Sequence, residues 1–185
     1  MSLVELIAQA DERGLAASGL ACLDRCIPLL DGDDEVLRPL WASLADGSDW
    51  AAVLDKARGA LDTAPSDADE AVLLARRMLE AAPAERTADA VRAWADACSV
   101  ASLRIHRLLD PAVDDTESAD GLGARRTGGT EGVSPLVAAE LRRQVVVLEL
   151  LAEHGKHGLR RALDITVEGR RVLRAVVSRR ARGRG

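Results

Sequence analysis

The chain has 185 residues, of which 48% are hydrophobic and 30% are charged, and its formal net charge is −5. This length suits one domain with one hydrophobic core and is short for two. Phe and Tyr are absent and there are three tryptophans, so we expect any binding surface to be aliphatic or electrostatic rather than aromatic. The abundance of Ala and Leu favours helices over strands.

Apolar residues recur at helical spacing from Leu3 to Leu30, which predicts two short helices or one helix kinked near Gly14. The acidic turn at residues 31–34 can cap a following helix, because short carboxylates accept hydrogen bonds from the unpaired amides of a first helical turn. Pro39 either kinks that helix or lies in a late first turn.

Three more helices are predicted before residue 110. Each starts at a residue that can cap a helix, and prolines at positions 65 and 83 end the first two. The third is the longest of this part of the chain and extends to Leu109. The predicted starts are Ser48, Ser66 and either Ala84 or Thr87.

The composition changes between residues 110 and 134, where Gly, Asp, Thr and Ser replace the large apolar side chains. Loops longer than about a dozen residues are uncommon inside compact domains unless they are functional or flexible. We therefore expect residues 111–134 to form a long disordered loop or flexible linker.

A helical hairpin is predicted for residues 135–182. Ser134 and Pro135 form a helix start, and Gly155 and Gly158 form a turn before the last helix. Gly169 should weaken that helix by about 1 kcal/mol relative to alanine. The core of the hairpin's first helix, residues 145–151, is apolar on nearly all sides, so we expect the hairpin to pack on the rest of the chain or on another copy.

These elements predict an all-α fold, a helical bundle or helical array of about six to eight helices. Residues 1–110 form an acidic helical body, residues 111–134 a linker and residues 135–182 the C-terminal hairpin, all within one domain. Glu5 and Asp11 interrupt the N-terminal apolar residues, which argues against a signal peptide, and we expect a cytoplasmic protein that does not contact membranes. Charged residues in the segment 136–152 argue against a transmembrane helix.

Charge divides the chain into an acidic body and a basic end. Residues 1–120 contain 24 acidic and 11 basic side chains, whereas residues 121–185 contain 6 acidic and 14 basic ones. Such a basic segment should pair with a negative partner. The favoured partner is the acidic body, in the same chain or in a second copy; nucleic acid and simple solvation stay open. The candidate binding residues are Arg170, Arg171, Arg174, Arg179 and Arg180.

Two places in the sequence contain residue types that can bind a metal ion. Cys22 and Cys26 share one helix face, and distant Cys98 and His106 could add ligands, but closely paired ligands are missing at the second end, so the cysteines are predicted to be small core residues. Histidines 154 and 157 follow glutamates 149 and 153, yet neither pair has the glutamate-x-x-histidine spacing of di-iron bundles. We assign the two histidines to the negative end of a helix dipole.

The sequence contains no nucleophile elbow and no glycine-rich phosphate loop after a strand. We therefore assign no catalytic residue, no metal-binding residue and no cofactor. We expect a non-enzymatic helical interaction or regulatory protein that acts through self-association, with homodimerisation as the specific hypothesis, or through a protein partner. A nucleic-acid-associated regulator using the basic last helix, and a helical small-molecule sensor or enzyme, remain as alternatives.

Overall fold

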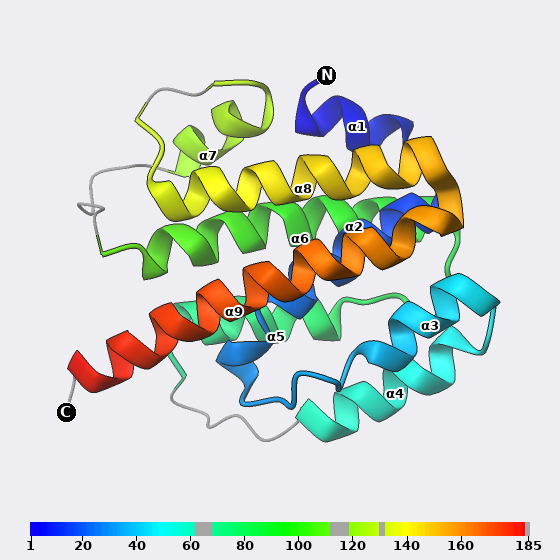
Figure 1. The fold of residues 1–185 in the computed structure, drawn as a ribbon, viewed down its shortest axis with the longest axis horizontal. Coiled ribbons are helices and arrows are strands. Elements are labelled where there is room, and N and C mark those ends of the chain that lie inside the picture. The colour runs from blue at the N-terminus through cyan, green and yellow to red at the C-terminus, as the bar shows by residue number, and fades with distance from the viewer. Residues whose placement is uncertain (62–67, 112–118, 130–131, 184–185) are drawn as a thin grey trace.

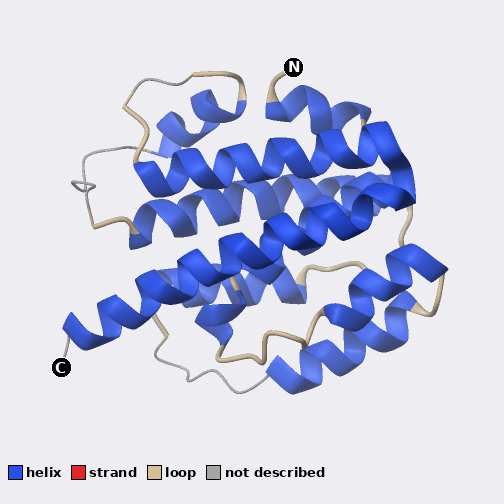
Figure 2. Ribbon diagram, viewed as in Figure 1, coloured by secondary structure: helices blue, strands red, loops and turns tan. Residues whose placement is uncertain are grey.

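The computed structural model describes residues 1–61, 68–111, 119–129 and 132–183. The prediction of an all-α fold is confirmed: in these ranges every regular element is a helix (Figure 2). The α-helices are α1 (Leu3–Gln9), α2 (Glu12–Arg25), α3 (Arg38–Asp46), α4 (Trp50–Leu61), α5 (Glu70–Glu80), α6 (Ala88–Leu109), α7 (Ala119–Arg126), α8 (Pro135–His154) and α9 (Leu159–Gly183). Two short 3-10 helices cover Ile27–Leu30 and Gly155–Gly158.

Helix α2 lies at the centre of the molecule and is buried along nearly its whole length. It packs against α6, α8 and α9, and α8 in turn packs against α6 and α9. Figure 1 shows α8 and α6 running side by side, with α9 crossing them obliquely and α3 and α4 forming a separate hairpin at one corner. The core therefore joins segments from both ends of the sequence.

Local capping determines several of the helix starts. The predicted starts at Thr87 and Ser134 are confirmed, because their hydroxyl groups accept hydrogen bonds from the backbone amides of Ala90 and Val137. For α4 the predicted cap was wrong: Asp49, not Ser48, accepts from the Ala52 amide, because Asp49 directly precedes the first helical residue, Trp50. The predicted start at residue 66 lies outside the described residues.

The structure decides between the alternatives that the sequence left open for residues 3–30 and for Pro39. Residues 3–25 form two helices, and the break lies at Ala10 because Asp11 caps the start of α2; Gly14 is already inside that helix. Pro39 lies in the first turn of α3, where its missing amide hydrogen costs no intrahelical bond.

The segment 111–134 differs from the continuous disordered loop that was predicted. Helix α7 forms within it, and residues 112–118 and 130–131 lie outside the described residues. Leu122 packs with Leu103 and Val137 in a small hydrophobic cluster. Arg126 forms an ion pair with Asp96 of α6. Leu122 is the buried apolar residue described in α7, and one such residue is too little apolar periodicity to predict a helix from the sequence.

The predicted C-terminal hairpin is present and packs on the body. Gly155 has a positive φ of 56°, a conformation that glycine adopts readily, and it begins the 3-10 turn between α8 and α9. Val147, Leu148 and Leu173 belong to the same hydrophobic core as α2 and α6. Within the described ranges, no helix has both the length and the apolar character required to cross a bilayer.

Candidate functional site

A buried ion pair joins α2 to α8. Arg25 donates through Nε to Oε2 of Glu140 and through Nη2 to Oε1, both at 2.8 Å. Both side chains are completely buried, with exposed fractions of 0%. A two-point contact between a guanidinium and a carboxylate is directional, so it fixes the positions of the two helices relative to each other.

Other helices supply the remaining hydrogen bonds of this pair. Ser102 of α6 and Gln144 of α8 donate to Oε1 of Glu140, at 2.7 and 2.9 Å. Arg25 also donates from Nη1 to the hydroxyl of Thr166 in α9, at 3.5 Å. The cluster thus connects α2, α6, α8 and α9, the helices that form the centre of the fold.

His106 completes the cluster on the α6 side. Its Nδ1 lies 2.7 Å from the carbonyl oxygen of Ser102, so a proton on this nitrogen is donated to that carbonyl, and Nε2 lies 3.5 Å from Oε2 of Glu140. Burial lowers the pKa of His106 despite the opposing charge of Glu140. Burial by itself would raise the pKa of Glu140, but the charges of Arg25 and His106, together with the hydrogen bonds from Arg25 and Gln144, outweigh it and lower that pKa to about 2.

The enclosure of this cluster indicates a structural role. Arg25, Glu140, Gln144, Ser102 and His106 each expose 1% or less of their surface. Their charged and polar atoms are satisfied by one another rather than turned toward a cavity. A fully satisfied buried network specifies how helices pack.

The three cysteines are free and buried. Burial raises the pKa of Cys22 to about 12 and also raises the pKa of Cys98. His154 lies 3.8 Å from Glu153 at the exposed end of α8, and His157 follows in the 3-10 turn. Among the described residues, no group of three or more His, Cys, Asp or Glu side chains is arranged to hold a metal ion.

Two of the five candidate arginines bind carboxylates of the same chain. Arg170 is buried and forms an ion pair with Asp24, which also accepts a hydrogen bond from Nε1 of Trp41 at 2.8 Å. Arg174, one turn further along α9, forms an ion pair with Asp34. These contacts hold the middle of α9 against the acidic body.

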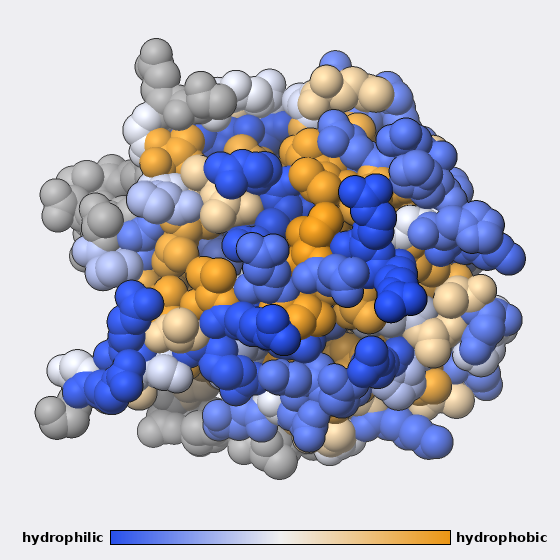
Figure 3. All heavy atoms as spheres, viewed as in Figure 1, coloured by the Kyte–Doolittle hydropathy of each residue, from blue (hydrophilic) through white to orange (hydrophobic). Residues whose placement is uncertain are grey.

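The other three candidates, Arg171, Arg179 and Arg180, have no ion pair with any residue that the structure describes. Arg171 and Arg179 are exposed and Arg180 is half-buried. Figure 3 shows hydrophilic side chains gathered over the C-terminal end of α9, with hydrophobic residues beside them. The structure therefore separates the five arginines into a paired group and an unpaired one.

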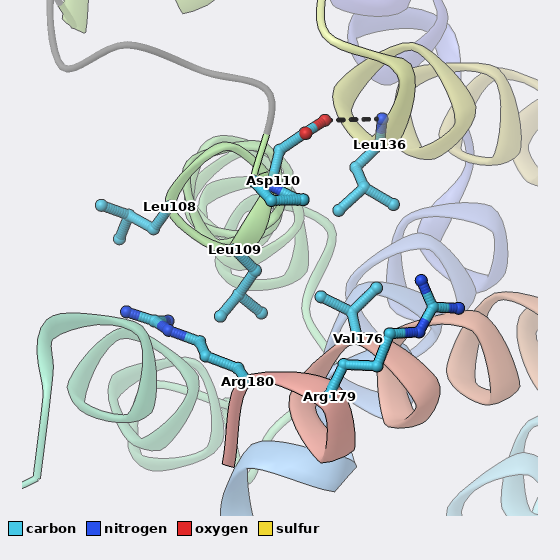
Figure 4. Close-up of a pocket in the computed structure, with 8 residues that line it drawn as sticks. Leu108, Leu109, Asp110, Leu136, Val176, Arg179 and Arg180 are labelled. Atoms are coloured by element: carbon cyan, nitrogen blue, oxygen red, sulfur yellow. Dashed lines mark hydrogen bonds between the residues drawn. The ribbon is translucent and has the colours of Figure 1, made fainter. Parts of the chain in front are cut away.

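Arg179 and Arg180 line a cavity of about 460 Å³ where α6 ends, α8 begins and α9 passes (Figure 4). Its apolar lining consists of Leu108, Leu109, Pro111, Leu136 and Val176. Asp110 is also at its edge, and Oδ2 of this residue accepts a hydrogen bond from the Leu136 amide at 3.1 Å. We call this the α9-end cavity.

A second hollow, of about 400 Å³, lies between α5 and α6. Its lining is mostly apolar, with Arg77 and Arg104 as its charged members, and we call it the α5–α6 groove. Its apolar lining residues are Leu74, Met78, Ala81, Trp94, Ala97, Cys98, Val100 and Ala101.

Sequence reasoning identified Arg179 and Arg180 but missed the walls of the α9-end cavity, because those walls come from the ends of separate helices. It also missed the buried ion pair. A signal for it exists in the sequence: Glu140 and Gln144 lie at helical spacing on the same stripe as Val137 and Val147. Polar residues on a buried stripe require buried partners.

Comparisons with protein families, with curated proteins and with solved structures find no match to this chain.

Proposed function

We propose that the protein is a helical interaction protein, and that it binds an acidic, amphipathic helix of a partner protein in the α5–α6 groove. The observation that carries this proposal is an apolar groove that stays open at the surface of a folded chain. Exposed apolar hollows with a charged rim are typical of surfaces that receive a partner helix.

The apolar part of the groove is partly accessible. Val100 of α6 exposes 41% of its surface, and Leu74 of α5 is half-buried. Ala97 and Ala101 lie one turn apart on α6, so the side chains that line the groove along this helix are short at both positions. Small side chains allow the backbone of a partner helix to approach closely.

Charge indicates the character of the partner. Arg77 is exposed and Arg104 pairs with the exposed Glu70, so the rim carries two guanidinium groups and one carboxylate. A helix with leucines on one face and glutamates beside them complements both the walls and the rim. A second copy of this groove would instead bring arginines against arginines.

The packing of the C-terminal hairpin also favours the α5–α6 groove as the contact surface. Val147, Leu148 and Leu151 of α8 are buried within the chain, so the apolar segment that motivated homodimerisation in the sequence is occupied by intramolecular packing. The α5–α6 groove is therefore the surface that we propose for contact with another protein.

A designed helical peptide with leucines at i, i+3, i+4 and i+7 and glutamates on both flanks is the probe, measured by fluorescence anisotropy of a label on the peptide. We expect it to bind the wild-type protein and to lose about tenfold or more in affinity for the groove-filling variant Ala101→Trp. Val172→Ser, a change at an exposed apolar residue of α9, is the matched control and should leave the affinity unchanged.

A peptide with lysines in place of the glutamates separates specific from general apolar binding. Equal binding of the two peptides, or no binding of the acidic one, would contradict the proposal. Light scattering supplies a further check: a wild-type dimer that Val100→Glu converts to a monomer would assign the groove to self-association instead.

A further inference from the structure

The α9-end cavity has the size and lining of a ligand site. Its volume of about 460 Å³ falls within the roughly 300–1,000 Å³ typical of small-molecule sites. Leu109, Leu136 and Val176 come from three different helices and converge on it, as Figure 4 shows. Leu109 exposes 5% of its surface, so this wall is recessed rather than projecting.

Charge at the cavity is positive. Arg179 and Arg180 extend on different sides of Leu109 and Val176 in Figure 4. The carboxylate of Asp110 lies on the far side, where it accepts a hydrogen bond from the start of α8. Two guanidinium groups against one carboxylate leave an excess of one positive charge around an apolar hollow.

The position of α9 is fixed before it reaches this cavity. The ion pairs of Arg170 with Asp24 and of Arg174 with Asp34 lie on the helical turns that precede Val176 and Arg179. A ligand therefore meets arginines that are carried on an anchored helix, which reduces the conformational cost of binding.

We propose that the α9-end cavity binds a monomeric medium-chain fatty acid. The alkyl chain lies against Leu109, Leu136 and Val176, and the carboxylate accepts hydrogen bonds from Arg179 or Arg180. An apolar wall with arginines beside it favours an anion with an apolar tail, because an inorganic anion would leave the walls uncovered and a neutral alkane would make no use of the guanidinium groups.

Nucleic acid fits this site less well. Arg170 and Arg174, which would extend the basic stripe along α9, are paired with aspartates of the body. The cavity lining contains no aromatic side chain on which a base could stack.

The test is isothermal titration of the full-length protein with decanoate below its micelle concentration, at physiological salt. The variant Arg179→Gln/Arg180→Gln should bind decanoate about tenfold or more weakly, as expected from the loss of charge-assisted hydrogen bonds. Arg171→Gln/Arg182→Gln removes the same charge from the same helix outside the cavity and should change the affinity by less than about twofold. Val176→Trp, which fills the cavity, should abolish binding.

Four further probes distinguish the sources of a binding signal. Decanol and inorganic phosphate should each bind much more weakly than decanoate, because each lacks one half of the proposed recognition. Equal loss of affinity in the two double variants, tighter binding to phosphatidylglycerol vesicles than to decanoate, or tighter binding to a DNA oligonucleotide would overturn the proposal, as would the absence of decanoate binding.

Discussion

Arg25 and Glu140 are separated by 115 residues in sequence and form a two-point ion pair in the middle of the core, with both side chains fully buried. Desolvating two charges is costly, and a favourable geometry with additional hydrogen bonds is needed to offset that cost. Here Ser102, Gln144 and Thr166 supply those bonds. The ion pair therefore fixes the position of α2, in the first third of the chain, relative to α8, in the last third.

Removing one partner should be far more costly than removing both. Glu140→Ala leaves the guanidinium of Arg25 buried without its carboxylate, and we expect a loss of about 3–5 kcal/mol in the free energy of unfolding. Urea denaturation followed by circular dichroism measures this change. The apolar pair Arg25→Met/Glu140→Leu should lose markedly less; a larger loss in the double variant than in the single one would contradict the account.

The same cluster predicts acid sensitivity. The pKa of His106 is lowered by burial from its ordinary 6.5, so the unfolded chain takes up a proton below that pH that the folded chain does not, and stability falls. The pKa of Glu140 is lowered from 4.5 to about 2, so its contribution is present above pH 4.5 and is lost between these values. Both groups make the folded state less stable as the pH decreases.

The pH prediction is checked by urea denaturation at a series of pH values. In His106→Gln the dependence on pH should flatten in the range just below pH 6.5, while the fall below pH 4.5 persists because Glu140 is still present. An unchanged slope in the upper window would show that His106 does not titrate as described.

Two glycines in helices should respond in opposite ways to alanine. A Cβ at Gly169 would lie 2.6 Å from Cδ of Arg25 and 2.9 Å from Cδ of Arg143, so Gly169→Ala should destabilise the protein by about 1–3 kcal/mol through overpacking. Gly59 in α4 has nothing within 4 Å of such an atom, and Gly59→Ala should stabilise by up to about 1 kcal/mol. Thermal unfolding of the two variants gives the comparison; stabilisation by both would refute the close approach.

The two ion pairs that anchor α9 should differ in how much each contributes to the free energy of unfolding. Arg170→Ala leaves the buried Asp24 without its ionic partner, and we expect a loss of about 3–5 kcal/mol. Arg174→Ala breaks a pair whose side chains are nearly half exposed, and we expect a loss below about 1 kcal/mol. Guanidinium chloride would screen these charges, so urea is the denaturant to use. Equal losses would contradict the difference in burial.

The cysteines should report unfolding. Their thiols are buried and the pKa of Cys22 is raised to about 12, so the reactive thiolate is rare in the folded state. We expect an aromatic disulfide reagent to react with all three thiols only as fast as the chain opens, and at once in denaturant. Rapid modification of the native protein without loss of helical signal would rule this out.

The helices could be predicted to the extent that local chemistry determines them. Thr87 and Ser134 act through amides three residues away, and such caps are readable in sequence. Helix α7 was missed because Leu122 and Arg126 are held by residues of α6 and α8 rather than by a repeating pattern. Gly169 shows the same limit: helix propensity predicts that alanine is better, whereas the approach of Arg25 predicts that it is worse.

The candidate sites, too, could be predicted only where local sequence determines them. The arginines of α9 were visible as a charge cluster, but their sequence does not distinguish Arg170, which faces Asp24, from Arg179, which lines the α9-end cavity. That distinction depends on how α9 crosses the body. Likewise the α5–α6 groove depends on how far apart α5 and α6 lie, and no single sequence motif encodes that distance.

The central position of α2 has a consequence for the order of events during synthesis. Asp24 and Arg25 leave the ribosome early, but their ionic partners, Arg170 and Glu140, are 146 and 115 residues further along the nascent chain. Until those residues emerge, the two side chains lack the ion pairs that they form in the folded core. The core should therefore close late, and a nascent chain stalled before residue 140 should expose the α2 surface to chaperones.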